Sequence, residues 1–140
     1  MRIRPADFAM DNAALRAVRF TVFVDEQRVP QSIEIDASDA SCVHLLALDD
    51  DDRAIGTVRI DIAQSGKVGR LAVLSTHRRQ GVGRALMKRI HAVAKDNDLD
   101  TVWCNAQVSA LPFYRALGYR VISESFYEAD IEHAKMECKL

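Results

Sequence analysis

The sequence predicts an α+β domain with one mixed, mainly antiparallel sheet and helices on both of its faces. Three observations support this fold class. Apolar residues alternate in short strand-like runs, two longer stretches repeat them at helical spacing, and one predicted helix separates two buried strand candidates, residues 71–74 and 101–106. These two strands are expected to lie parallel through one right-handed crossover, with a ligand outside their carboxyl ends.

The amino-terminal half contains a helix among short strands. Three runs rich in apolar residues are expected to form strands: 1–5, 42–48 and 54–62. Pro5 is expected to end the first strand, since proline cannot donate to a ladder. Apolar residues at helical spacing predict a helix from Asp11 to about Gln27, followed by an acidic loop. The charged residues 49–53 are expected to form a hairpin turn.

The carboxyl-terminal half contains two helices and three strands. Apolar residues recur at helical spacing from Val82 and predict a helix to about Asn97, before the strand at 101–106. A shorter helix is expected with Ser109 as its N-cap and Gly118 as a left-handed residue at its end. The last two strands, joined by a loop through Tyr127 and Asp130, are expected at 120–125 and 131–139.

Bulk properties indicate one globular domain spanning residues 1–140, long enough to bury about two thirds of its unfolded surface. The formal net charge is −1, which argues against a nucleic-acid-binding surface. Cys42, Cys104 and Cys138 show no metal-ligand spacing and are expected to be buried thiols in a reducing compartment. Since neither a signal peptide nor an apolar segment of membrane length is visible, we expect a cytoplasmic protein without metal or membrane partners.

Glycines and arginines mark the turn before the central helix. The run reads Arg78-Arg79-Gln80-Gly81-Val82-Gly83-Arg84. Backbone N–H groups are unpaired at a helix start and carry partial positive charge, so this position suits a phosphate group. The glycines let the phosphate approach the backbone closely, and the arginines add charged donors. A lone Gly-x-Gly is nevertheless more often an incidental helix start with a solvated basic face.

The strand and turn together resemble a known coenzyme-binding segment. Leu71-Ala72-Val73 followed by Arg-x-x-Gly-x-Gly is similar to the coenzyme A pyrophosphate site of the GNAT superfamily of acyl-CoA-dependent N-acyltransferases. The resemblance implies a GNAT-like fold, acetyl-CoA as the acyl donor, and a strand whose backbone pairs with the amide-rich coenzyme arm. The coenzyme-binding residues expected from the turn and the resemblance are Leu71, Ala72, Val73, Arg78, Arg79, Gln80, Gly81, Val82, Gly83, Arg84, Gln107 and Tyr114.

A second motif lies in the short helix near the carboxyl end. Phe113-Tyr114-x-x-x-Gly118-Tyr119 resembles the GNAT segment in which a helix tyrosine faces the thioester sulfur. The resemblance implies that Tyr114 is the general acid for the departing thiolate. Taken alone, such a tyrosine is more often a core aromatic with a satisfied hydroxyl. Gln107 stands where GNAT chains often have asparagine, and its longer amide is still expected to bind the coenzyme arm.

The sequence leaves the amine-binding group open. Five polar residues near predicted element ends could hold an ammonium group or remove its proton: Glu26, Glu34, Asp36, His44 and His133. Each histidine alone is more often a hydrogen-bonded structural residue. Glu26 and His133 are the catalytic residues we expect beside Tyr114.

Three functional hypotheses follow. The runs at 22–27 and 128–136 resemble a subgroup of small bacterial GNAT proteins, the ElaA/YjcF-like acetyltransferases, so the first is an acetyl-CoA-dependent N-acetyltransferase of a small-molecule or peptide amine. Edge strands near the carboxyl end add the expectation of a homodimer. The second is an acyltransferase similar to acyl-homoserine-lactone synthases, because Arg19-x-x-x-Phe23 followed by Glu34-x-Asp36-x-x-Asp39 resembles their amino-terminal signature. The third is a non-catalytic acyl-CoA sensor.

Overall fold

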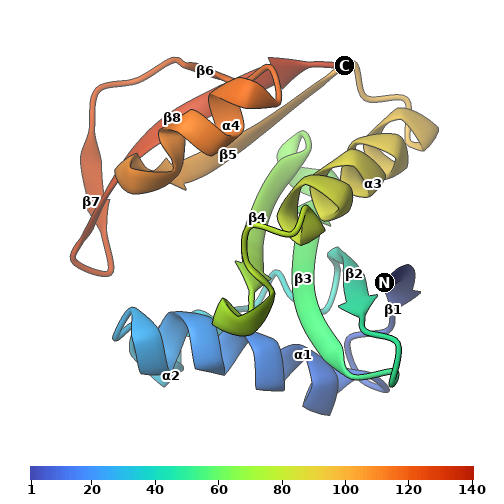
Figure 1. Ribbon diagram of the computed structural model, residues 1–140. Helices are drawn as coiled ribbons and strands as arrows, with labels where there is room; N and C mark the ends of the chain where they lie inside the picture. The colour runs from blue at the N-terminus through green and yellow to red at the C-terminus, as the bar shows by residue number, and fades with distance from the viewer.

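All eight strands belong to one mixed sheet (Figure 1). The computed structural model describes residues 1–140, and the strands follow the order β1-β2-β3-β4-β5-β8-β6, with β7 also paired to β8. Every neighbouring pair is antiparallel except β4 and β5, which confirms the predicted sheet. The strands are β1 (Arg2–Ala6), β2 (Val43–Leu48), β3 (Ala54–Asp61), β4 (Lys67–Val73), β5 (Thr101–Gln107), β6 (Arg120–Val121), β7 (Phe126–Glu128) and β8 (Ile131–Lys139).

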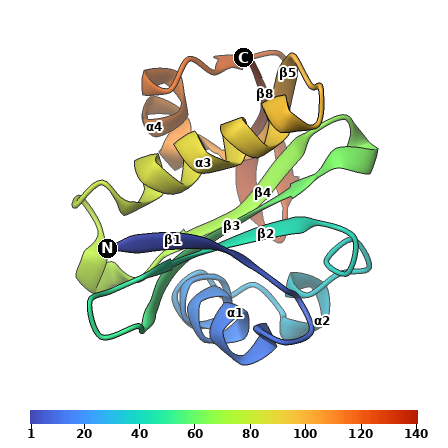
Figure 2. The ribbon, with the colours of Figure 1, turned by 90° about the vertical axis from the view of Figure 1, so that its right-hand side faces the viewer.

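Helices cover both faces of the sheet (Figure 2). They are α1 (Asn12–Arg19), the π-helix η1 (Phe20–Glu26), α2 (Gln31–Glu34), α3 (Val82–Asp96) and α4 (Leu111–Ala116), with 3₁₀ turns η2 (Ile62–Gln64), η3 (Ser75–His77) and η4 (Val108–Ala110). On the face of α1, Leu15 packs with Leu46 and Leu48. On the face of α3 and α4, Leu86 and Ile90 belong to the main core, which excludes apolar surface from water. None of these helices is both long and apolar enough to cross a membrane.

β4 and β5 separate soon after they meet. Their paired residues are Lys67 and Trp103, and Figure 1 shows the strands diverging beyond that point. The parallel arrangement that the sequence predicts is therefore present but short. A bulge in β4 lies beside the opening, where Arg70 has φ of +51°. The opening leaves one edge of β4 with backbone N–H and C=O groups that no strand pairs.

The first helix differs from its prediction in its second half. The stretch from Asp11 to Gln27 is α-helical only to Arg19 and continues as the π-helix η1. An apolar pattern does not separate the two helix types, because a π-helix adds only one residue per hydrogen-bonded turn. The acidic loop that follows also contains one helical turn, α2.

Other predicted element ends are wrong in detail. Pro5 does not end β1, which continues to Ala6 at the edge of the sheet, where a missing donor is tolerated. α4 begins after Ala110 rather than Ser109, because a 3₁₀ turn comes first and no side chain caps the helix. The strand predicted at 120–125 is limited to β6, and the loop predicted after it contains β7.

A buried ionic cluster fixes the acidic loop to α1 and β3. Arg19, fully buried, donates to Glu34 Oε1 and Asp39 Oδ1, each at 2.7 Å. Arg59 donates to Asp39 Oδ1 and Asp36 Oδ1, each also at 2.7 Å. Buried charges are tolerated when each is paired in this way. The loop that the sequence presents as acidic is therefore neutralised by arginines from two other elements.

The three cysteines are free thiols. Cys104 and Cys138 are buried as predicted, whereas Cys42 is half-buried. Burial raises the pKa of the Cys42 thiol to about 11 and that of Cys104 to about 12. All three side chains therefore behave as small apolar groups at neutral pH.

Candidate active site

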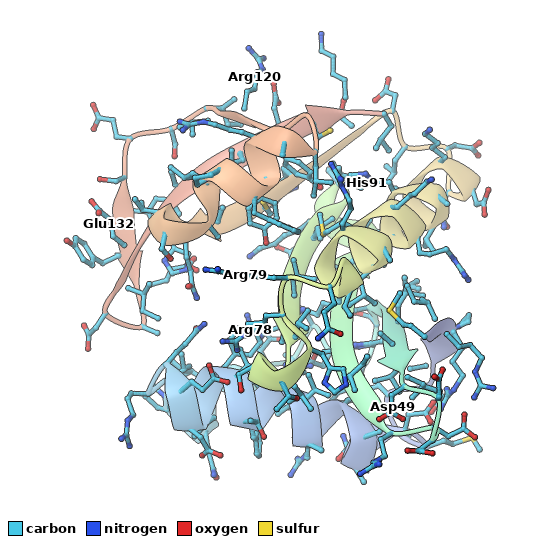
Figure 3. The ribbon with its side chains drawn as sticks, in the orientation of Figure 1. Asp49, Arg78, Arg79, His91, Arg120 and Glu132 are labelled. Carbon is cyan, nitrogen blue, oxygen red and sulfur yellow. The ribbon has the colours of Figure 1, made fainter.

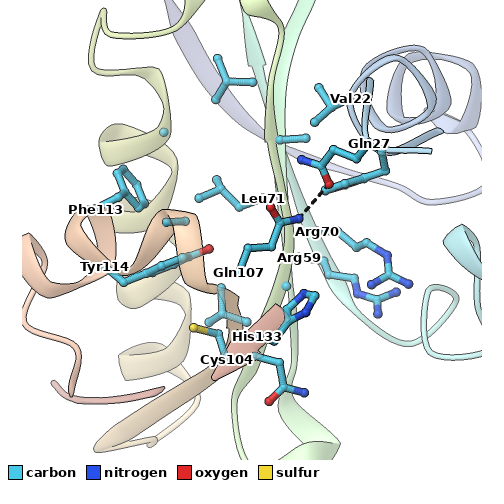
Figure 4. A pocket seen from close by; sticks show the side chains of 18 of the residues that line it. Val22, Gln27, Arg59, Arg70, Leu71, Cys104, Gln107, Phe113, Tyr114 and His133 are labelled. Carbon is cyan, nitrogen blue, oxygen red and sulfur yellow. Dashed lines mark hydrogen bonds between the residues drawn. The ribbon is translucent and has the colours of Figure 1, made fainter. Parts of the chain in front are cut away.

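A cavity of about 1010 Å³ opens where β4 and β5 diverge. Both strands contribute their carboxyl ends, Val73 and Gln107, to its lining, so the cavity lies where the sequence predicts a ligand. Figure 4 shows Tyr114 and Phe113 on one side of β4 and Arg70 on the other. The cavity therefore reaches both sides of the opening in the sheet.

The helix start at Gly81 has the geometry expected of an anion site. Gly81 is the N-cap of α3 with φ of +83°, a left-handed conformation that L residues other than glycine rarely adopt, and no side chain caps the helix. The first N–H groups of α3 are therefore free for a ligand. At Gly83 an added Cβ would meet the Phe113 ring at 3.5 Å, an ordinary contact, so packing within the protein does not require glycine there.

The predicted phosphate-binding arginines differ in their partners. Arg79 and Arg84 line the cavity and form no ion pair within the protein. Arg78 also lines the cavity, but its Nη2 donates to both carboxylate oxygens of Glu26, at 2.8 and 3.0 Å. Figure 3 shows Arg78 above the first helical segment of the chain. Gln80 lies outside the lining and donates weakly to the backbone of the turn.

Tyr114 projects into the cavity from α4. Its ring makes an edge contact with Phe113, with centroids 5.1 Å apart, and Figure 4 shows its hydroxyl directed toward β4 at Leu71. Burial, with a smaller contribution from Cys104, raises the pKa of Tyr114 above its usual value. The hydroxyl therefore keeps its proton at neutral pH, as a general acid must.

The β4 backbone and Gln107 form the floor between the two sides. Leu71, Ala72 and Val73 line the cavity along the unpaired edge of β4. Gln107 at the end of β5 donates from Nε2 to Gln27 Oε1 at 2.8 Å, across the cavity (Figure 4). The strand edge and the Gln107 amide thus lie beside one another, as the predicted coenzyme arm requires.

His133 on β8 presents one ring nitrogen to the cavity. Its Nδ1 lies 2.7 Å from the carbonyl oxygen of Ile131. Because a carbonyl oxygen can only accept, Nδ1 carries the hydrogen, and Nε2 of the neutral ring carries a lone pair. Nε2 lies 4.0 Å from Glu128 Oε2. The geometry gives His133 the form of a general base.

The structure brings some of the predicted amine-binding residues together and not others. Glu34 and Asp36 line the cavity, but both are held by the arginines of the ionic cluster. Glu26 lies outside the lining, in its ion pair with Arg78. His44 is not part of the cavity: it is buried, bonded through Nε2 to the Asp39 carbonyl oxygen at 2.8 Å. Of the five, His133 and Glu34 each line the cavity with one polar atom that makes no hydrogen bond, Nε2 and Oε2, and the Glu34 oxygen is buried.

Three cavity residues were missed by sequence reasoning. Gln27 lies at the end of the predicted helix, and the sequence marks it only as part of the family-like run 22–27. Arg70 extends from the β4 bulge to Asp36, and nothing local in the sequence marks that bulge. Glu128 belongs to a hairpin that was predicted as a loop.

The chain as a whole is similar to known acyltransferases. The family model for the acetyltransferase (GNAT) domain matches residues 9–140. The uncharacterized N-acetyltransferase YjcF of Bacillus subtilis (strain 168) is 40% identical over 121 residues, 85% of this chain and 86% of YjcF. The crystal structure of an acyl-CoA N-acyltransferase from Pseudomonas aeruginosa has a TM-score of 0.86 at 28% identity and covers 99% of both chains. Escherichia coli ElaA has a TM-score of 0.88 at 26% identity, over 99% of this chain and 100% of ElaA.

The sheet that opens between β4 and β5, with a glycine turn at one side of the opening, defines an acyl-CoA N-acyltransferase fold. The chain belongs to the GNAT acetyltransferase family, in the group of small bacterial proteins that includes YjcF and ElaA. This confirms the resemblance and the enzyme class predicted from the sequence. GNAT enzymes use acyl-CoA donors and act on amines.

Proposed function

We propose that this chain is an acetyl-CoA-dependent N-acetyltransferase that acts on the amine of a small molecule or a peptide by direct attack on the thioester. The supporting observation is that the uncapped start of α3 and the Tyr114 hydroxyl open onto one cavity, on the side of the unpaired β4 edge. The residues present fit the coenzyme, because donors for a diphosphate and for an amide-rich arm follow one another along this wall.

Each part of the wall has a separate role. The N–H groups at Gly81 and the guanidinium groups of Arg79 and Arg84 hold phosphate oxygens. The bulged β4 backbone near Leu71 offers N–H groups to the arm and to a carbonyl oxygen that gains negative charge. Bound acetyl-CoA would supply the activated acetyl thioester. Tyr114 gives a proton to the departing sulfur, and His133 takes one from the amine.

The acyl-homoserine-lactone-synthase hypothesis loses its main support in the structure. Arg19, Glu34 and Asp39, which carry that signature, are buried and bonded to one another. Their pattern therefore has a sufficient structural explanation, without a second substrate.

Calorimetry with coenzyme A tests the binding half of the proposal. Gly81→Asp should lower coenzyme affinity by about tenfold or more, since a carboxylate would repel the diphosphate. Aspartate strains the left-handed backbone less than most other residues do. Ser125→Asp adds the same charge at an exposed residue outside the cavity and should have no effect. The proposal would be rejected if the native chain did not bind coenzyme A, or if Gly81→Asp bound it as tightly as Ser125→Asp.

Thiol release from acetyl-CoA with a panel of amines tests the catalytic half. An N-acetyltransferase releases coenzyme A in proportion to acetylated amine. A sensor would bind the coenzyme, yet no amine would accelerate thioester loss.

A further inference from the structure

Glu128 differs from the other carboxylates of the cavity. Of the other three, Asp36 accepts from Arg59, and Asp61 is held through both oxygens by its own turn. Glu34 accepts from Arg19 through Oε1, and its Oε2 has no partner but is buried away from solvent. Glu128 is half-exposed, and the only hydrogen bond of its side chain is from Asn105 Nδ2 to Oε1, at 3.2 Å. Its second oxygen, Oε2, accepts no hydrogen bond and faces the Nε2 atom of His133.

One hairpin, β7–β8, determines the setting of His133. Phe126 on β7 stacks on its ring, with centroids 6.0 Å apart and an interplanar angle of 18°. Ile131 on β8 fixes the hydrogen on Nδ1, and Glu128 on β7 stands opposite Nε2. In the neutral ring, two hydrogen-bond acceptors therefore face each other with no donor between them.

The distance between these acceptors suits a shared donor. Glu128 Oε2 and His133 Nε2 are 4.0 Å apart, too far for a direct hydrogen bond. One nitrogen atom can nevertheless lie about 2.9 Å from both, a normal hydrogen-bond length. An ammonium group has three donors and a positive charge, which complements a carboxylate and a lone pair together.

We propose that Glu128 Oε2 and His133 Nε2 together bind the acceptor as its ammonium form, so that the substrate is an amine that is cationic in solution. This inference rests on the proposed function and names the acceptor class for the same site. The ammonium gives one proton to Nε2, and the imidazolium that results is stabilised by Glu128. The neutral amine then forms the C–N bond while the C–S bond breaks, and the thiolate takes the Tyr114 proton. The acylated nitrogen gives its excess proton to the Tyr114 phenolate, and His133 returns its proton to solvent, so the amide and the coenzyme A thiol remain.

The charges on the opposite wall agree with a cationic acceptor. Arg59 and Arg70 line the cavity, but Asp36 accepts hydrogen bonds from both, and Asp39 and Glu34 also pair with them. The Lys67 ammonium, also on the lining, lies 5.3 Å from the centre of the Trp103 ring. Lys135, next to His133 along β8, has its ammonium 4.4 Å from the centre of the Trp103 ring. Glu128 is thus the available carboxylate beside the base.

A pair of probes of equal shape tests the inference without the coenzyme. Benzylammonium and benzyl alcohol differ mainly in charge, and NMR of the His133 ring protons, assigned with His133→Asn, reports their binding. We expect saturable shifts with benzylammonium and affinity about tenfold or more weaker for benzyl alcohol. Glu128→Gln should weaken benzylammonium about tenfold and leave benzyl alcohol unchanged.

Glu132→Gln is the matched control, because Glu132 is exposed and Figure 3 shows it at the outside of the same hairpin. It should bind both probes as the native chain does. The inference would be overturned if the native chain bound both probes with equal affinity. It would also be overturned if Glu128→Gln bound benzylammonium as tightly as the native chain does.

The coenzyme measurements separate this inference from the proposed function. If coenzyme A binds and amines are acetylated, but Glu128→Gln leaves the KM of every cationic acceptor unchanged, the acceptor assignment is wrong and the activity stands. If benzylammonium binds at Glu128 and coenzyme A does not bind, the site stands and the activity is wrong.

Discussion

The Gln107 amide on β5 donates to Gln27 Oε1 at 2.8 Å, and this hydrogen bond joins the end of β5 to the end of η1 across the cavity. The two residues are 80 positions apart in the chain. Gln107 is the residue whose amide we expect to bind the coenzyme arm. The bond therefore occupies one of the two N–H donors of the Gln107 amide, and opening it would free that donor for the arm.

Removing this bond from one side or the other should change coenzyme A affinity in different directions. Gln27→Ala should leave coenzyme A affinity equal or raise it by up to about fivefold, because a competing bond of about 1 kcal/mol is lost. Gln107→Ala should weaken it. Calorimetry measures both, with Gln31→Ala on exposed α2 as the control. Weaker binding by Gln27→Ala would assign Gln27 to the coenzyme site instead.

Tyr114→Phe isolates the proton that goes to sulfur. We expect kcat to fall by about 100-fold or more, the usual size of a general-acid effect, with coenzyme affinity nearly unchanged because the ring still packs on Phe113. Steady-state kinetics and calorimetry give the two values. Tyr127→Phe, at an exposed residue, is the control. Unchanged turnover in Tyr114→Phe would mean that another group donates the proton.

The ionic cluster makes stability depend on acid pH. Burial alone would raise the pKa of Asp39, but hydrogen bonds from Arg19 and Arg59 and a backbone N–H outweigh it and lower the pKa to about 2, from 3.8. A lowered folded-state pKa stabilises the protein above pH 4, and this contribution, about 2 kcal/mol, is lost as pH falls from 4 through 2.

Urea unfolding at several pH values measures this dependence. Asp39→Asn should flatten the pH dependence of the unfolding free energy between pH 4 and 2, and Asp25→Asn on the exposed surface should not. Arg19→Ala should cost about 3–5 kcal/mol at neutral pH, because buried Glu34 loses its hydrogen-bonding arginine and buried Asp39 keeps only Arg59. An unaltered pH profile in Asp39→Asn would show that other carboxylates dominate acid unfolding.

Local signals explain which parts of the site the sequence predicts. A left-handed glycine at a helix start is visible as Gly81 before an apolar helical repeat, so the phosphate turn follows from residues close together in the chain. The burial of Glu34 does not follow from local sequence, because a carboxylate is usually exposed and its partner Arg19 is 15 positions away. Glu128 was missed because the tip of its hairpin carries neither glycine nor asparagine.

That tip provides the last prediction. Glu128 pairs with Ile131 through a two-residue loop, and both loop residues have positive φ, +49° for Ala129 and +61° for Asp130. Such loops favour asparagine and glycine, and alanine in this conformation costs about 1 kcal/mol. Ala129→Gly should therefore raise the unfolding free energy by about 0.5–1 kcal/mol, or Tm by about 3 °C.

Differential scanning calorimetry measures this change, and Ala63→Gly is the opposite control. Ala63 lies in η2 outside the positive-φ residues, so glycine there should only add freedom to the unfolded chain and lower Tm. Because Ala129→Gly leaves Glu128 and His133 in place, benzylammonium affinity should change less than twofold if the native hairpin already holds them correctly. A lower Tm for Ala129→Gly would show that the alanine is unstrained. A large loss of benzylammonium affinity would show that the stiffness of this turn holds the Glu128 carboxylate opposite the His133 imidazole.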